Sequence, residues 1–143
     1  MKVFVDTSAW IALAAAKDPY HEVVAAAWRE MLGRGARPVT TSDMIAETIT
    51  FLRYRAGHRA AVEFREAIRE AVEKGRLRLI WVDEELFAQA WAVFLRYADW
   101  DLSMADCTGL ALCRREKIRT ALTLDRHFRV AGLETVPEIA ARR

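Results

Sequence analysis

Val3-Phe4-Val5-Asp6-Thr7-Ser8, near the start of the chain, predicts a strand that passes directly into a helix. The three apolar residues are β-branched or aromatic, which is typical of a short buried strand. Asp6 ends this strand, and apolar residues then recur with helical spacing from Ser8 to Ala16. A strand followed at once by a helix is the unit from which α/β domains are built.

The same alternation continues to the end of the chain. Further strands are predicted at residues 39–41, 77–82, 121–123 and 133–136, and further helices at 19–32, 42–55, 59–74, 83–97 and 103–115. This order predicts an α/β domain with a mainly parallel sheet. Because no internal repeat, linker or low-complexity tract interrupts the pattern, residues 1–143 are predicted to form a single domain.

The composition is that of a globular protein. The 143 residues are 53% hydrophobic and 29% charged, which is enough for a hydrophobic core and too apolar for a disordered chain. A net charge of +2 does not by itself indicate nucleic-acid binding. Most of the 22 basic residues are arginines, whose planar side chains match pairs of phosphate oxygens. A GC-rich coding bias explains the same excess, so both interpretations stay open.

The sequence predicts a cytoplasmic protein. Asp6 comes too early for a signal peptide, and no apolar run approaches the ~20 residues that span a bilayer. Cys107 and Cys113 lie on one predicted helix, about 9 Å apart along its axis, which is too far for a disulfide. The absence of a Cys-x-x-Cys pair also fits a reducing compartment.

Four acids are predicted to lie at one edge of the sheet. Asp6 ends the first strand, and Asp125 follows the fourth. Glu47 lies in the second turn of the helix after the second strand, and Asp106 lies in the first turn of the helix that Ser103 opens. Ligands of parallel α/β sheets collect beyond the carboxyl ends of the strands, so these acids are candidates for a binding site.

Each acid also has a purely structural interpretation. Asp6 and Asp125 can cap helices, Asp106 can form a capping box with Ser103, and Glu47 can be a solvated helix residue. Four carboxylates that converge on one edge, however, repel one another and raise their own pKa values. A hard cation such as Mg²⁺ or Mn²⁺ neutralises such a cluster, and it activates water for attack on a phosphodiester.

Four segments resemble the motifs of a known family in the family's own order. They are Val5-Asp6-Thr7-Ser8, Ser42-Asp43-Met44-Ile45-Ala46-Glu47-Thr48, Asp101-Leu102-Ser103-Met104-Ala105-Asp106-Cys107, and Ala121-Leu122-Thr123-Leu124-Asp125-Arg126-His127-Phe128. The family is that of the PIN domains, and each segment matches the one that bears one of its four acids. The resemblance spans residues 5–128, which is nearly the whole chain.

The length and the stand-alone domain most resemble VapC-type toxins of toxin–antitoxin pairs. The resemblance implies a three-layer α/β/α domain with about five strands and an endoribonuclease that uses Mg²⁺ or Mn²⁺. It also implies a homodimer and inhibition by a cognate antitoxin. The catalytic metal ligands that it implies are Asp6, Glu47, Asp106 and Asp125. The residues that it implies as hydrogen-bonding support are Thr7, Ser8, Ser103 and Thr123.

Arg53, Tyr54 and Arg55 are candidate RNA contacts near the helix that bears Glu47, and Arg59 extends the basic run. A tyrosine can stack on an unpaired base, and arginines can hold the phosphate backbone. Alternate residues of a helix do not share a face, however, and arginines are common at helix ends. The five tryptophans are expected mostly in the core, although exposure of those in the two N-terminal helices would indicate a partner surface.

Other α/β phosphate chemistries fit less well. This sequence lacks the acidic pair and the Lys-Pro that are usual in a phosphate-accepting receiver domain. A haloacid-dehalogenase-like phosphatase needs a second acid at the position where Ser8 stands. The three histidines have no metal-ligand spacing and are expected on surfaces or helix ends. Two questions stay open: whether Asp99 and Asp101 assist the cluster or cap loops, and whether the domain binds RNA or a partner without cutting.

Overall fold

The computed structural model describes residues 1–138, which form seven helices and five strands. In chain order the elements are β1 (Lys2–Val5), α1 (Thr7–Ala14), α2 (His21–Gly33), β2 (Arg37–Thr41), α3 (Ser42–Ala56), α4 (His58–Glu73), β3 (Arg78–Ile80), α5 (Glu84–Arg96), α6 (Met104–Glu116), β4 (Thr120–Leu122), α7 (Arg126–Val130) and β5 (Glu134–Val136). The last five residues of the predicted single domain, 139–143, lie outside the described range.

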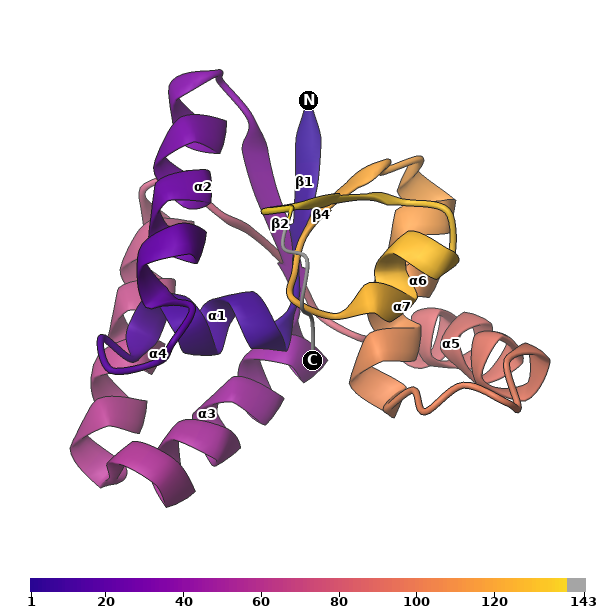
Figure 1. Ribbon diagram of the computed structural model, residues 1–143. Coiled ribbons are helices and arrows are strands. Elements are labelled where there is room, and N and C mark those ends of the chain that lie inside the picture. The colour runs from indigo at the N-terminus through magenta and orange to yellow at the C-terminus, as the bar shows by residue number, and fades with distance from the viewer. Residues whose placement is uncertain (139–143) are drawn as a thin grey trace.

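The strands form one parallel sheet in the order β3-β2-β1-β4-β5. Figure 1 shows α1, α2 and α4 on one side of this sheet and α5, α6 and α7 on the other, while α3 runs below it. The predicted three-layer α/β/α architecture with a five-stranded sheet is therefore confirmed.

Alternation along β1 divides the core into two parts. Val3 and Val5 are fully buried in the cluster that also contains residues of α1, α2 and α4. Phe4 is fully buried in the second cluster, with residues of α5 and α6, and its ring stacks on Phe128 of α7 at 5.9 Å between centroids. Successive residues of a strand point to opposite faces, so one short apolar run supplies both cores.

A glycine allows α6 to lie close to the sheet. A Cβ atom placed on Gly109 would come within 2.6 Å of Phe4 Cζ and 3.2 Å of Met44 Cε. Side chains in a close-packed core cannot yield that much space without shifting their neighbours. The absence of a side chain at Gly109 thus sets how near α6, and the Asp106 that it carries, lies to β1.

Some predicted boundaries differ from the structure. The strand predicted at residues 77–82 pairs with β2 only over Arg78–Ile80, and the first helix ends at Ala14 because Ala15 is extended. Most of the tryptophans lie in or against the core as expected, namely Trp10, Trp28 and Trp100. Trp81 and Trp91 do not, since they are 69% and 47% exposed. Trp81 follows the short β3 directly, and Trp91 lies on the outer face of α5.

The cysteines and the helix lengths bear on two further properties of the chain. Cys107 and Cys113 are free and buried, and burial raises the pKa of both thiols, to about 11 and about 12. Within residues 1–138, none of the helices has the length and apolarity that crossing a bilayer requires.

Candidate metal centre

The candidate site lies where the direction of strand addition reverses. From β1 the sheet extends through β2 to β3 on one side, and through β4 to β5 on the other. The carboxyl ends of the two strands that flank such a reversal border a crevice, which is where parallel α/β sheets bind ligands. Asp6 follows β1 directly, and Asp125 follows β4 after two residues.

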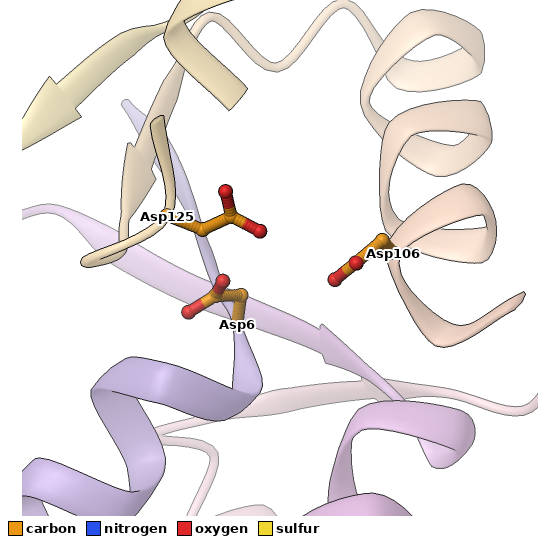
Figure 2. A group of neighbouring side chains, drawn as sticks. All are labelled: Asp6, Asp106 and Asp125. Atoms are coloured by element: carbon orange, nitrogen blue, oxygen red, sulfur yellow. The ribbon is translucent and has the colours of Figure 1, made fainter. Parts of the chain in front are cut away.

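Three carboxylates converge in this crevice. Asp6, Asp106 and Asp125 each offer an oxygen atom, and these atoms lie within 4.8 Å of one another. In Figure 2 the side chains of Asp125, from the loop after β4, and Asp106, from the first turn of α6, point toward each other, and the carboxylate of Asp6, at the end of β1, lies beneath that of Asp125. Segments separated by about a hundred residues in the sequence therefore meet at one point.

Asp6 is the most deeply buried of the three, with 2% of its surface exposed. Its Oδ1 accepts hydrogen bonds from Ser8 Oγ at 2.7 Å and from the Ala9 backbone N–H at 3.2 Å, and its Oδ2 accepts from Thr123 Oγ1 at 2.7 Å. Burial raises the pKa of Asp6 to about 7, against the lowering effect of these hydrogen bonds, and Asp106 adds to the rise. A carboxylate at this position is thus costly unless a proton or a cation neutralises it.

Asp106 is held by a capping box at the start of α6. Ser103 Oγ accepts from the Asp106 N–H at 3.0 Å, and Asp106 Oδ2 accepts from the Ser103 N–H at 3.0 Å. Burial raises the pKa of Asp106 to about 6, and the negative charges of Asp125 and Glu47 add to the rise. Its second oxygen remains available to face the other two acids.

Asp125 is oriented by its neighbours in the chain. Its N–H donates to Thr123 Oγ1 at 2.8 Å, and its Oδ1 accepts from the His127 N–H at 2.9 Å. The Nδ1 atom of His127 also lies 2.9 Å from Asp125 Oδ1, and its ring lies 5.8 Å from that of Trp100. The sequence did not indicate His127 as a neighbour of the site; its position two residues after a candidate ligand, in the first turn of the helix that this ligand caps, was the available signal.

Glu47 lines the same pocket of about 400 Å³ but is not one of the three converged acids. It is close enough for its charge to raise the pKa of Asp43, after the larger effect of burial, and that of Asp106. Asp101 also lines this pocket, whereas Asp99 is not among its lining residues. The pocket therefore brings together the four acids named from the sequence, three of them in direct reach of one another.

The hydroxyl groups predicted as support take different parts. Ser8 Oγ donates to Asp6 and accepts from the Leu124 N–H at 2.8 Å, so it joins the ends of β1 and β4. Thr123 likewise joins Asp6 to Asp125. Thr7 lines the pocket, but its hydroxyl lies against Met44 of α3, 3.1 Å from the sulfur, and is not bonded to an acid.

The donor set suits a hard divalent cation. Every ionisable group of the three-membered cluster is a carboxylate, and oxygen ligands are those that Mg²⁺ and Mn²⁺ prefer. A cation at this point would remove both the mutual repulsion and the desolvation cost that hold the pKa values of Asp6 and Asp106 high.

The candidate RNA contacts divide between two faces of α3. Arg53 hydrogen-bonds His58 at the start of α4. Tyr54 is 83% exposed, and it lines a second, shallow groove together with Arg55 and Glu47. The Arg55 guanidinium lies 5.1 Å from the centre of the Phe51 ring.

Known proteins share the sequence pattern of this chain. The family model of the PIN domain matches residues 3–133. The chain belongs to the PIN-domain family. The matched range includes all four segments that resemble the family's motifs, those that bear Asp6, Glu47, Asp106 and Asp125.

Two curated relatives come from Mycobacterium tuberculosis. One is named 23S rRNA-specific endonuclease VapC20; it is 35% identical over 140 residues, which are 95% of this chain and 99% of the relative. The other is named Ribonuclease VapC26, with 28% identity over 127 residues, 88% of this chain and 89% of the relative.

Solved structures agree with this placement. The crystal structure of Mycobacterium tuberculosis VapC20, described as a Sarcin-Ricin loop cleaving toxin, matches with a TM-score of 0.82 and 32% identity over 99% of each chain. VapBC2 from Rickettsia felis, bound to a DNA fragment from its promoter, matches with a TM-score of 0.65 over 94% of this chain and 97% of that one. At 12% identity, this second likeness concerns the fold alone.

Proposed function

We propose that this protein is a metal-dependent endoribonuclease and the toxin of a VapBC-type toxin–antitoxin pair. The observation that carries the proposal is the convergence of Asp6, Asp106 and Asp125 at the point where strand addition reverses. The likeness to VapC20 over nearly the full length of both chains supports it.

In this proposal Asp6, Asp106 and Asp125 bind Mg²⁺ or Mn²⁺, and Glu47 completes the acidic wall of the pocket. A divalent cation in such a site acidifies water and stabilises negative charge on a phosphodiester. The hydroxyls of Ser8 and Thr123 keep the Asp6 carboxylate in place through hydrogen bonds of 2.7 Å each. Groups that orient ligands in this way tune a metal site without touching the ion.

The proposed substrate is RNA, and ribosomal RNA is the first candidate because the relative VapC20 is named for 23S rRNA. The proposed activity on ribosomal RNA would take place in the cytoplasm. The alternative function is that of a PIN-like module that binds RNA or a partner without cutting RNA.

The test is cleavage of intact ribosomes and of total RNA by purified protein with Mn²⁺, with Mg²⁺ and with EDTA. We expect metal-dependent cutting that falls at least about a hundredfold in Asp6→Asn, since one group that stabilises developing charge is typically worth that much. Asp99→Asn is the matched control, because Asp99 does not line the pocket.

Each other outcome has a definite meaning. Cutting that survives Asp6→Asn would indicate a contaminant or a different site. No cutting by the folded, antitoxin-free protein under any condition would favour the binding module.

We assign the antitoxin to a large apolar groove on the α1, α2 and α4 side of the sheet. The groove has a volume of about 1400 Å³, and aromatic side chains of Trp10, Trp28 and Phe64 form part of its wall. Trp10 lies 5.7 Å from Trp28 and 6.0 Å from Phe64, between ring centres. An apolar groove of this size, with arginines among its lining residues, suits a partner segment that carries both apolar and acidic side chains.

We also propose a homodimer that forms through α5. Phe87, Trp91 and Leu95 are 52%, 47% and 61% exposed, and they recur every fourth residue along one face of the helix. A stripe of large apolar side chains left in water is typical of a surface that a partner covers.

A further inference from the structure

We propose that Tyr54 and Arg55, supported by Phe51, form a binding site for a single-stranded nucleotide that flanks the scissile phosphate. This inference rests on the proposed nuclease function and adds the residues that hold the substrate beside the metal centre. It assigns RNA binding to Tyr54 and Arg55 and not to Arg53, a distinction that the sequence alone could not make.

The groove that carries this inference adjoins the acidic pocket at Glu47. It has a volume of about 580 Å³ and is lined by Ala46, Glu47, Thr50, Phe51, Tyr54 and Arg55. Glu47 lines both the groove and the acidic pocket. A chain whose phosphate lies among the acids therefore has a path along α3 for its neighbouring nucleotide.

Helix geometry explains this path. Glu47, Phe51 and Tyr54 are separated by four and three residues, so they lie one turn apart on one face of α3. From Glu47 to Tyr54 the helix rises about 10 Å. This distance is within reach of a nucleotide adjacent to the one at the metal centre.

The side chains of the groove have the chemistry that unpaired RNA requires. Tyr54 is 83% exposed, so its ring is accessible to a base. The Arg55 guanidinium lies over the Phe51 ring at 5.1 Å, a cation–π contact that restrains the arginine, and Arg55 is itself exposed to solvent. Bases stack on aromatic rings and on guanidinium planes, and the positive charge attracts the phosphate backbone.

Arg53 belongs to a different surface. It hydrogen-bonds His58 across the turn between α3 and α4, and it does not line the groove. Arg53 and Arg55 thus have the same charge and lie two residues apart on the same helix, but only Arg55 lines the groove. They form a matched pair for an experiment.

The experiment measures the affinity of the full chain for a fluorescein-labelled single-stranded RNA of mixed sequence, by anisotropy in EDTA at several salt concentrations. Cleavage is absent without metal, so binding is measured separately from the proposed nuclease activity. Tyr54→Ala, Tyr54→Phe, Arg55→Ala and Arg53→Ala are compared with the wild type, and light scattering gives the oligomeric state of each.

We expect Tyr54→Ala to weaken binding about five- to a hundredfold with an unchanged salt dependence, because one stacked base is lost. Tyr54→Phe keeps the ring and should bind as the wild type does. Arg55→Ala should weaken binding and lower the slope of log affinity against log salt by about 0.7, the value for one phosphate contact on a single strand. Arg53→Ala should change neither quantity.

Three results would overturn the inference. They are wild-type affinity in Tyr54→Ala, equal losses in Arg53→Ala and Arg55→Ala, and no RNA binding by the wild type. A monomeric Tyr54→Ala variant with unchanged RNA affinity would identify the groove as a protein interface. Binding through the groove by a protein that cuts no RNA would leave the inference standing and the nuclease proposal refuted.

Discussion

At the scale of single residues, Asp6 combines two tasks that usually oppose each other. It caps α1 by accepting from the Ala9 N–H, and it also faces Asp106 and Asp125 in the acidic pocket. Capping favours the ionised carboxylate, whereas burial disfavours it, and burial is the larger effect because the pKa is raised to about 7. The ionised Asp6 carboxylate therefore destabilises the folded, metal-free protein, and a bound cation would remove this cost.

This conflict predicts a pH dependence of the metal-free protein. The folded-state pKa of Asp6 is about 7, well above its unfolded value of 3.8, so this group favours folding below about pH 4 and loses that contribution as the pH rises through 7. In EDTA, the melting temperature of Asp6→Asn should therefore exceed that of the wild type by a margin that widens from pH 5 to pH 7.5 and then levels off.

Thermal unfolding by circular dichroism, with and without Mn²⁺, makes the measurement. Mn²⁺ should raise the melting temperature of the wild type and not that of Asp6→Asn, since only the wild type gains binding energy in the folded state. A margin independent of pH would show that Asp6 is not desolvated in the manner described.

At the scale of secondary-structure elements, the position of α6 depends on Gly109. The helix begins with the capping box of Ser103 and Asp106, and one turn later Gly109 meets Phe4 and Met44. The same helix therefore carries a metal-binding candidate at its start and a close contact with the core directly after it.

Gly109→Ala should destabilise the protein by about 1–3 kcal/mol, because an added methyl group overpacks a dense core. Urea unfolding gives this free energy, and Mn²⁺ titration should show weaker binding because α6 must move with Asp106. Gly33→Ala is the control: Gly33 also lies in a helix, with no atom within 4 Å of an added Cβ, so stability should stay equal or rise. Equal stability of the two variants would contradict the close-contact explanation.

At the scale of the whole molecule, the apolar groove and the acidic pocket lie apart, so a substitution in the groove should abolish antitoxin binding without abolishing RNA cleavage. Ala67→Glu places a charge in the groove, on the far side of the sheet from α5 and α6, and should prevent the co-expressed cognate antitoxin from co-purifying while RNA cleavage persists. Ala26→Glu is the control, because Ala26 is exposed on α2 and does not line the groove. An unchanged antitoxin complex of Ala67→Glu would exclude the groove.

The stripe on α5 makes a second prediction at this scale. Trp91→Asp should convert a dimer into a monomer at micromolar concentration, as measured by light scattering, because it places a charge in the centre of the apolar patch. Val130→Asp introduces the same charge at a 58% exposed apolar residue of α7 and should leave the mass unchanged. A wild-type protein that is already monomeric would rule out the proposed interface.

Much of the local structure follows from local rules. The apolar run at Val3–Val5 predicts β1, and the capping residues at Asp6, Ser103 and Asp125 predict where three helices begin. These features depend on neighbours a few residues away, so they can be read without knowing the fold. The same is true of the three aspartates as candidate ligands, because each lies just after a predicted strand or in the first turn of a predicted helix.

Other features depend on segments that only folding brings together. The sequence did not indicate the His127 contact with Asp125, the exposure of Trp81 and Trp91, or the different surroundings of Arg53 and Arg55. A side chain's exposure depends on whether another element packs over it, and a repeating pattern describes only the element itself. For that reason Trp91, which was expected in the core with the other tryptophans, could be placed at the surface only by the tertiary structure.

The amino-acid sequence alone determined the order of strands and helices and the parallel sheet, and it indicated the candidate acids, because hydrophobic periodicity and capping act over a few residues. Only the tertiary structure decided that β4 lies beside β1, so that Asp6 and Asp125 meet, and that Glu47 stands at the wall of their pocket. Strand order and side-chain distance result from packing among elements far apart in the chain, where the burial of both faces of the sheet selects one arrangement.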